Sequence, residues 1–256
     1  MKTYRQTWYS SREHKTNDLN GLRIAEDRRT KGGVNNDYRP QADYSTSSGP
    51  VSVYFKDLES NLIKHIQKAD AVVGCVAWLT NFNILNALSK VSCSVVIQKE
   101  DLWRPDMGAK GDFKQRLRAA YNKLGTGIDR YYAPGIVSSL NVCGDPTWDG
   151  IRCVGNLNTA RSPSNPRAHH KFLVFCQVSE ELSAYGDTIP KVTPYAVWTG
   201  SYNFTKNGGA SFQNAVYIDD PVLAQAYANE YAHIYAVSEP LDFEPEWVAP
   251  EYRIGT

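Results

Sequence analysis

The strongest constraint on the fold is an alternation of strand-like and helix-like segments between Val51 and Ile97. Polar and apolar residues alternate at the start of this region, and two continuous apolar runs follow later in it. In the segment that precedes the first run, apolar positions recur every three or four residues. The expected elements are strands over 51–55, 71–78 and 95–97 and helices over 58–69, with Asp57 as its cap, and 80–90. This order predicts an α/β fold with a mixed, largely parallel central sheet flanked by helices.

The second half of the chain continues this pattern less regularly. It predicts a basic amphipathic helix over 110–124, a strand over 128–132, a long loop over 135–166, an insertion over 177–194, strands over 195–198 and 215–218, and a helix over 221–235. The loop carries Trp148 and Arg161, so two interpretations stay open. It shapes access to a site and contacts a substrate, or it packs on itself.

Two short polar motifs adjoin apolar runs in this half. His169 and Lys171 open the run over 171–175, and Gly200, Ser201 and Asn203 follow the run over 195–198. A neutral imidazole is a competent nucleophile towards phosphorus, and Lys171 would share its strand face. Ser201 and Asn203 also share a face and carry donors, while Gly200 lets the backbone approach a ligand. The residues therefore suit attack on a phosphodiester through a phosphohistidine.

Each motif alone has a plainer interpretation. A strand with His and Lys on its exposed face is usually only solvated, and G-S-x-N by itself is a turn signal. The order of the two motifs, their spacing and the apolar strands beside them favour a functional site.

Together the motifs resemble the phospholipase D superfamily, whose members carry H-x-K-x(4)-D and a later G-S-x-N. The resemblance implies a phospholipase D-like fold and a catalytic set of His169, Lys171, Ser201, Asn203 and Gln213. In the family, a histidine from a second copy of the motif protonates the leaving group. Because this chain has one H-x-K, the resemblance implies a homodimer with a shared site.

The chain departs from the family pattern at two positions. Cys176 stands at the family's aspartate, where a small buried residue is tolerated, and Gln213 stands at its glutamate. Gln213 can accept a hydrogen bond from the imidazole but carries no charge to stabilise an imidazolium, which should slow the reaction. Three acidic residues of the insertion are alternative orienting groups: Glu180, Glu181 and Asp187.

Composition is that of an ordinary globular protein, with 42% hydrophobic and 21% charged residues. We expect a polar N-terminal arm over 1–48, with a linker over 45–50, one catalytic domain over 49–237 and a C-terminal surface extension over 238–256. The N-terminus lacks a signal-peptide pattern, and five cysteines without C-x-x-C favour a reduced, cytoplasmic protein. No membrane anchor is expected.

Because a chain of this size with one motif resembles the dimeric endonucleases of the family, the preferred function is a metal-independent nuclease that cleaves DNA or RNA. Arg161, Arg167 and Lys206 are its candidate substrate-binding residues. The alternatives are a phospholipid-cleaving enzyme and a catalytically weakened nucleic-acid-binding subunit. No cofactor and no metal are expected, because the sequence shows no clustered carboxylates or Cys/His ligand sets.

Overall fold

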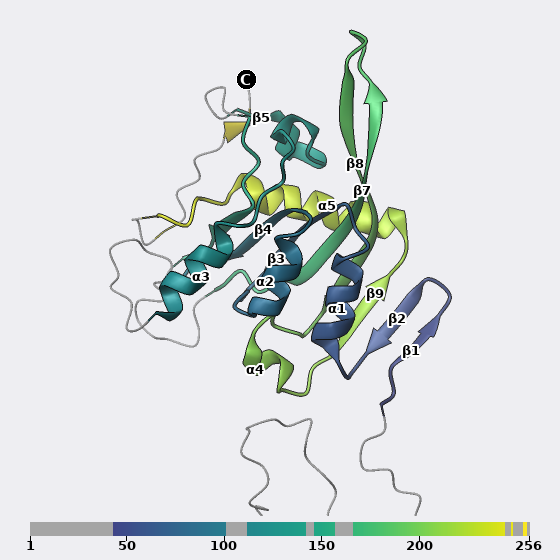
Figure 1. The fold of residues 1–256 in the computed structure, drawn as a ribbon, viewed down its shortest axis with the longest axis vertical. Coiled ribbons are helices and arrows are strands. Elements are labelled where there is room, and N and C mark those ends of the chain that lie inside the picture. Colours follow the sequence, from purple (N-terminus) through teal and green to yellow (C-terminus); the bar gives the residue numbers. More distant parts are fainter. Residues whose placement is uncertain are drawn as a thin grey trace, which may run out of the picture.

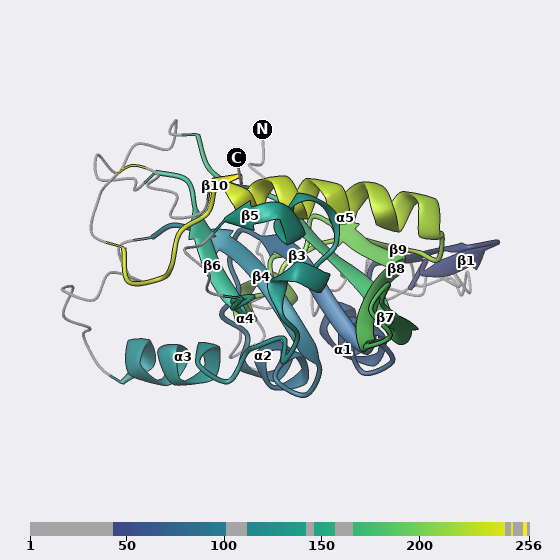
Figure 2. The ribbon, with the colours of Figure 1, turned by 90° about the horizontal axis from the view of Figure 1, so that it is seen from above.

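The computed structural model of the chain describes residues 43–100, 112–141, 146–156, 166–243, 247 and 253–254. These residues form three layers (Figures 1 and 2). An eight-stranded sheet lies between α5 (Pro221–Ala236) on one face and α1 (Leu58–Ile66), α2 (Phe82–Leu88) and α3 (Phe113–Tyr121) on the other. Most of the predicted N-terminal arm lies outside the described residues, so that prediction stays open.

The sheet is mixed. In spatial order its strands are β1 (Thr46–Ser48), β2 (Val51–Tyr54), β9 (Ala215–Ile218), β8 (Thr188–Gly200), β7 (Lys171–Leu182), β3 (Ala71–Val76), β4 (Ser92–Gln98) and β6 (Ile151–Val154). Two adjacent pairs of this sheet are parallel, β3 with β4 and β4 with β6, and its remaining adjacent pairs are antiparallel. The α/β class, the mixed sheet and the flanking helices are confirmed, but "largely parallel" is wrong. Hairpin connections join β7, β8 and β9, and such connections reverse the strand direction.

Shorter elements complete the described chain. They are α4 (Lys206–Gly209), the 3₁₀ helices η3 (Arg130–Tyr132) and η4 (Gly135–Ser139), and a two-stranded sheet of β5 (Leu140–Asn141) and β10 (Arg253–Ile254). The strand predicted over 128–132 is therefore wrong, and the loop predicted over 135–166 contains β6 of the main sheet. The linker predicted over 45–50 contains β1, which pairs with β2.

Helices α2 and α5 begin with side-chain caps, whereas α1 and α3 do not. Asn81 accepts hydrogen bonds from the first free backbone N–H groups of α2, and Asp220 does the same for α5. Asp57 precedes α1 as predicted, but its side chain makes no capping bond because its backbone is left-handed, with φ 50°.

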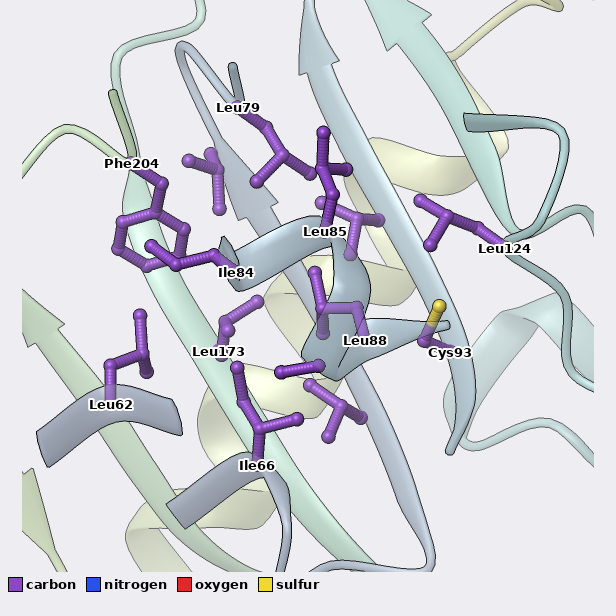
Figure 3. Packing of buried hydrophobic residues seen from close by; sticks show 14 of the residues in the cluster. Leu62, Ile66, Leu79, Ile84, Leu85, Leu88, Cys93, Leu124, Leu173 and Phe204 are labelled. Carbon is purple, nitrogen blue, oxygen red and sulfur yellow. The ribbon is translucent and has the colours of Figure 1, made fainter. Parts of the chain in front are cut away.

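Two apolar cores hold the layers together. Figure 3 shows the first, in which Leu62 and Ile66 of α1 meet α2 residues and Leu173 of β7. The second packs Phe172 and Val174 of β7 against α5. The first half of β7, residues 171–176, is thus buried on both faces, which explains its continuous apolar sequence after Lys171.

The segment after α5 is part of the fold. Ser238 and Glu239 are buried, and Glu239 pairs with the buried Lys99. Arg152 of β6 donates from Nε to Ser238 Oγ at 2.7 Å and from Nη1 to Asp149 at 2.7 Å. The predicted surface extension is therefore wrong over 238–243, where charged residues pair inside the protein.

The predicted insertion over 177–194 is a β-ribbon. Strands β7 and β8 continue past the sheet as one long hairpin that projects from the body (Figure 1). Leu182 and Tyr185 are exposed near its tip, and Lys191 forms an ion pair with Glu181 across it.

Candidate active site

The two sequence motifs meet at one edge of the sheet, opposite the projecting ribbon. Lys171 pairs with Val76 at the carboxyl end of β3, and Phe172 pairs with Thr199 near the end of β8. His169 lies two residues before the start of β7. In open α/β sheets the carboxyl ends of parallel strands are the usual place for a ligand.

His169 and Lys171 are in direct contact. Lys171 Nζ lies 3.1 Å from Nδ1 and 3.2 Å from Nε2 of His169, and it donates to the His169 carbonyl at 2.8 Å. Lys171 is buried and His169 is exposed. The imidazole is therefore open to a ligand while a buried ammonium group lies beside it.

Both groups have lowered pKa values. Desolvation lowers the pKa of His169 below its ordinary 6.5, and the charges of Lys171, Arg167 and His170 lower it further. Burial lowers the pKa of Lys171. A lowered pKa keeps the imidazole neutral near pH 7, which is the form that acts as a nucleophile.

Trp78 contacts both motif residues. Its ring centroid lies 5.5 Å from that of His169, edge to face, and 6.0 Å from Lys171 Nζ. Its Nε1 donates to Glu100 Oε1 at 3.2 Å. Trp78 follows β3 and Glu100 follows β4, so two parallel strands deliver them to the same edge. The sequence interpretation did not assign either residue to the site. The signal available for Trp78 was its position at the end of the strand predicted over 71–78, just before the helix predicted over 80–90.

The G-S-x-N turn is fixed by backbone contacts. Gly200 has φ 153°, and a Cβ there would lie 2.3 Å from the Asn214 carbonyl oxygen, so the position requires glycine. Ser201 donates its N–H to the Asn214 carbonyl, and its hydroxyl accepts the Asn214 N–H, both at 3.0 Å. The Ser201 hydroxyl therefore holds together the two strands that carry the motif.

The same turn is tied to the Trp78 segment. The N–H groups of Thr80 and Asn81 both donate to the Phe204 carbonyl at 2.9 Å. Beside it, the Asn203 side chain carries a buried Oδ1 that has no hydrogen-bond partner within the described chain. An unpartnered buried amide oxygen is costly, so this side chain has bonding capacity left for a ligand or water.

The remaining predicted site residues differ in how close they lie to His169. Arg167 is close enough to His169 for its charge to lower the pKa of the imidazole. Lys206 is exposed at the start of α4. Gln213 is half-buried, and within the described residues it makes no hydrogen bond with His169. Arg161 lies outside the described residues.

Neither Cys176 nor the acidic residues of the ribbon belong to the site. Cys176 is fully buried in the core beneath α5, where burial raises its pKa to about 12. It lies five residues beyond Lys171 on β7, about 16 Å at the rise of a strand. Glu180, Glu181 and Asp187 follow farther along the ribbon, so the alternative that they orient His169 is wrong.

The described residues contain no group of three or more His, Cys, Asp or Glu side chains placed to hold a metal ion. None of their helices is long and apolar enough to cross a membrane.

No family model matches the chain. Its sequence is 29% identical over 215 residues to the uncharacterized protein L381 of Acanthamoeba polyphaga mimivirus, covering 77% of this chain and 69% of that protein. In fold the chain is similar to NucT from Helicobacter pylori, with a TM-score of 0.46 and 11% identity over 74% of this chain and 98% of NucT. It is also similar to Nuc from Salmonella typhimurium, a phospholipase D family member, with a TM-score of 0.41 and 17% identity over 74% of this chain and 97% of Nuc.

Proposed function

We propose that the chain is a phospholipase D-like nuclease that cleaves phosphodiesters without a metal ion, with His169 as the nucleophile. The observation that carries the proposal is the contact between His169 and Lys171 beside the G-S-x-N turn. An accessible, neutral imidazole and a buried ammonium group are what attack on a phosphodiester needs. The free, buried cysteines of the described chain suit a reducing cytoplasm.

The reaction takes two displacements. In the first, a nitrogen of His169 bonds to phosphorus, the ester P–O bond breaks, and the leaving oxygen takes a proton from a general acid. In the second, water attacks phosphorus, the N–P bond breaks, and a proton of the water returns to the former acid. The products are an alcohol and a phosphate monoester, and both catalytic groups are restored.

Lys171 and Asn203 stabilise the charge that develops on the non-bridging oxygens. The Lys171 ammonium group, which donates to His169 in this structure, would donate to a bound phosphate instead, and this exchange frees the imidazole to attack. The Asn203 amide belongs to the turn that faces the same edge and adds a neutral donor. Arg167 and Lys206 add positive charge for the flanking phosphates.

The general acid comes from a second copy of the chain. Besides His169, the described residues include three histidines: His65, partly buried against Tyr217, His170, which lies 3.5 Å from Glu230 of α5, and His233, exposed on α5. None of the three forms a hydrogen bond or a ring contact with His169 within the described chain. A two-fold homodimer that places two His169 residues across one phosphate supplies the missing group.

The test is incubation of the purified protein with single- and double-stranded DNA and RNA, and separately with phospholipid vesicles, in excess EDTA. Wild type and His170→Ala should both cleave nucleic acid, whereas His169→Ala should not. His170 is the matched control because it is the adjacent histidine. Full cleavage by His169→Ala would refute the proposal. Release of a lipid head group without cleavage of nucleic acid would show that the protein is a phospholipid-cleaving enzyme and not a nuclease.

Native mass measurement tests the shared site. The chain has a mass of 28.7 kDa, and the active species should have twice that mass. An active monomer would contradict the proposed source of the general acid.

A further inference from the structure

An aromatic–arginine cluster lies on the surface where α2 and α3 begin. We call Phe82, Phe113 and Arg116 the platform. The rings of Phe82 and Phe113 meet edge to face, with centroids 6.1 Å apart, and the Arg116 guanidinium lies 5.0 Å from the centre of the Phe82 ring. Phe113 is 42% exposed, and the Arg116 side chain is 59% exposed. Much of an aromatic surface and a guanidinium plane therefore faces solvent.

Packing against the cores explains Phe82 but not the exposure of Phe113 and Arg116. Phe82 precedes the buried row of α2 and packs, partly buried, against the first core. The buried residues of α3 are Lys114, Leu117 and Tyr121, one helical row that omits Phe113 and Arg116. Within the described chain Phe113 belongs to neither core, and its exposed ring meets that of Phe82 at the start of α2.

The platform lies on the same side of the sheet edge as the candidate active site. Phe82 comes four residues after Trp78, which contacts His169, and directly after Asn81, whose N–H bonds to the Phe204 carbonyl. On the other side of the G-S-x-N turn, Phe212 is 64% exposed immediately before Gln213. Phe82 and Phe212 are thus close in sequence to the two segments that meet at the proposed reaction centre, the Trp78 segment and the G-S-x-N turn.

We propose that the platform binds unpaired bases of single-stranded nucleic acid and guides the adjacent phosphate to His169. This inference rests on the proposed nuclease function and names its substrate class. Phenylalanine rings and arginine guanidinium planes stack on every base, and arginine also pairs with backbone phosphate. Bases inside a duplex are stacked on each other, so they do not offer their faces to such a surface.

Neighbouring charges allow this binding. The Arg116 guanidinium lies 3.4 Å from Asp112, but both side chains are exposed, at 59% and 73%, and such pairs exchange readily for a phosphate. The side-chain amides of Asn81 and Asn83 donate to the Glu59 carboxylate, each at 2.6 Å, so this carboxylate is held at the start of α2 and forms no ion pair with Arg116 in the described chain. The Arg116 guanidinium and the Phe113 ring are therefore available to an anionic strand.

The experiment uses the full chain with His169→Ala, so that binding is measured without cleavage. Fluorescence anisotropy would compare a labelled single strand with the duplex of the same sequence. In this background Phe113→Ala and Arg116→Gln should each weaken single-strand binding roughly 5- to 100-fold, the range for the loss of one base stack, with little effect on the duplex. Tyr185→Ala, an exposed aromatic at the tip of the ribbon, should bind like its parent.

Arg116→Lys separates stacking from charge, because lysine keeps the charge but has no planar group. It should weaken single-strand binding nearly as much as Arg116→Gln. If Phe113→Ala and Arg116→Gln bind the single strand as tightly as Tyr185→Ala while wild type still cleaves nucleic acid, the platform is refuted and the nuclease function stands. If no nucleic acid is bound or cleaved, the proposed function itself fails.

Discussion

His65 should make the stability of the fold depend on pH. Its ring stacks on Tyr217, with centroids 3.8 Å apart and planes 17° from parallel, and its Nε2 lies 3.2 Å from the Tyr54 hydroxyl. Burial lowers the pKa of His65 from 6.5 to about 4, and the charges of Lys68 and Lys64 act in the same direction.

The direction and the size of this pH effect follow from the protons that His65 binds in the folded and the unfolded chain. The unfolded chain takes up a proton at this residue near pH 6.5, whereas the folded chain takes it up only near pH 4. The contribution of His65 to the free energy of unfolding is therefore fully present above pH 6.5, and it is lost as the pH is lowered towards 4. A change of that size corresponds to about 3 kcal/mol at 1.36 kcal/mol per pH unit, and partial solvation of the ring reduces it to about 2 kcal/mol.

Urea unfolding at about pH 7 and about pH 4 measures this difference. His65→Phe keeps an aromatic ring on Tyr217 but cannot be protonated, so it should lose about 2 kcal/mol less than wild type over this interval. His233→Gln, which removes an exposed histidine from α5, is the control and should follow wild type. Equal losses in wild type and His65→Phe would refute the reasoning.

Three further predictions concern the site. Gly200→Ala should lower the free energy of unfolding by about 2–4 kcal/mol, because the added Cβ meets a backbone carbonyl. Gly186→Ala at the open ribbon tip should lower it by only about 1 kcal/mol, and equal losses in urea unfolding would contradict the prediction. Gln213→Glu should raise the cleavage rate several-fold by stabilising an imidazolium, and an unchanged rate would mean that residue 213 does not face the imidazole in the active state. Arg167→Ala removes a charge that lowers the pKa of His169, so the acid limb of the pH–rate profile should move to higher pH, towards 6.5; an unmoved limb would show that the two residues are not coupled.

The sequence was sufficient where the signal is local. Continuous apolar runs predicted β3 and β4, and the motif spacing placed His169 and Gly200 at strand ends, where the structure has them. Strand direction was not predictable in this way, because it depends on which strands become neighbours and not on the composition of any one strand.

The features that the sequence did not predict depend on contacts between residues that are far apart in the chain. Arg152 interrupts the apolar pattern of β6, and its burial depends on distant partners such as Asp149 and Ser238. Trp78 and Glu100 are 22 residues apart and meet only because β3 and β4 are adjacent and parallel. No periodicity in the sequence reports such a pair.

The most direct test of the central claim is to trap the covalent intermediate. Protein mixed with a short oligonucleotide in excess EDTA would be quenched in alkali, which preserves a phosphohistidine, and the peptide that contains His169 would be analysed by mass spectrometry. The account predicts a nucleotide adduct on His169 in wild type and none in His169→Ala. Cleavage without an adduct, at the same rate in both proteins, would contradict it.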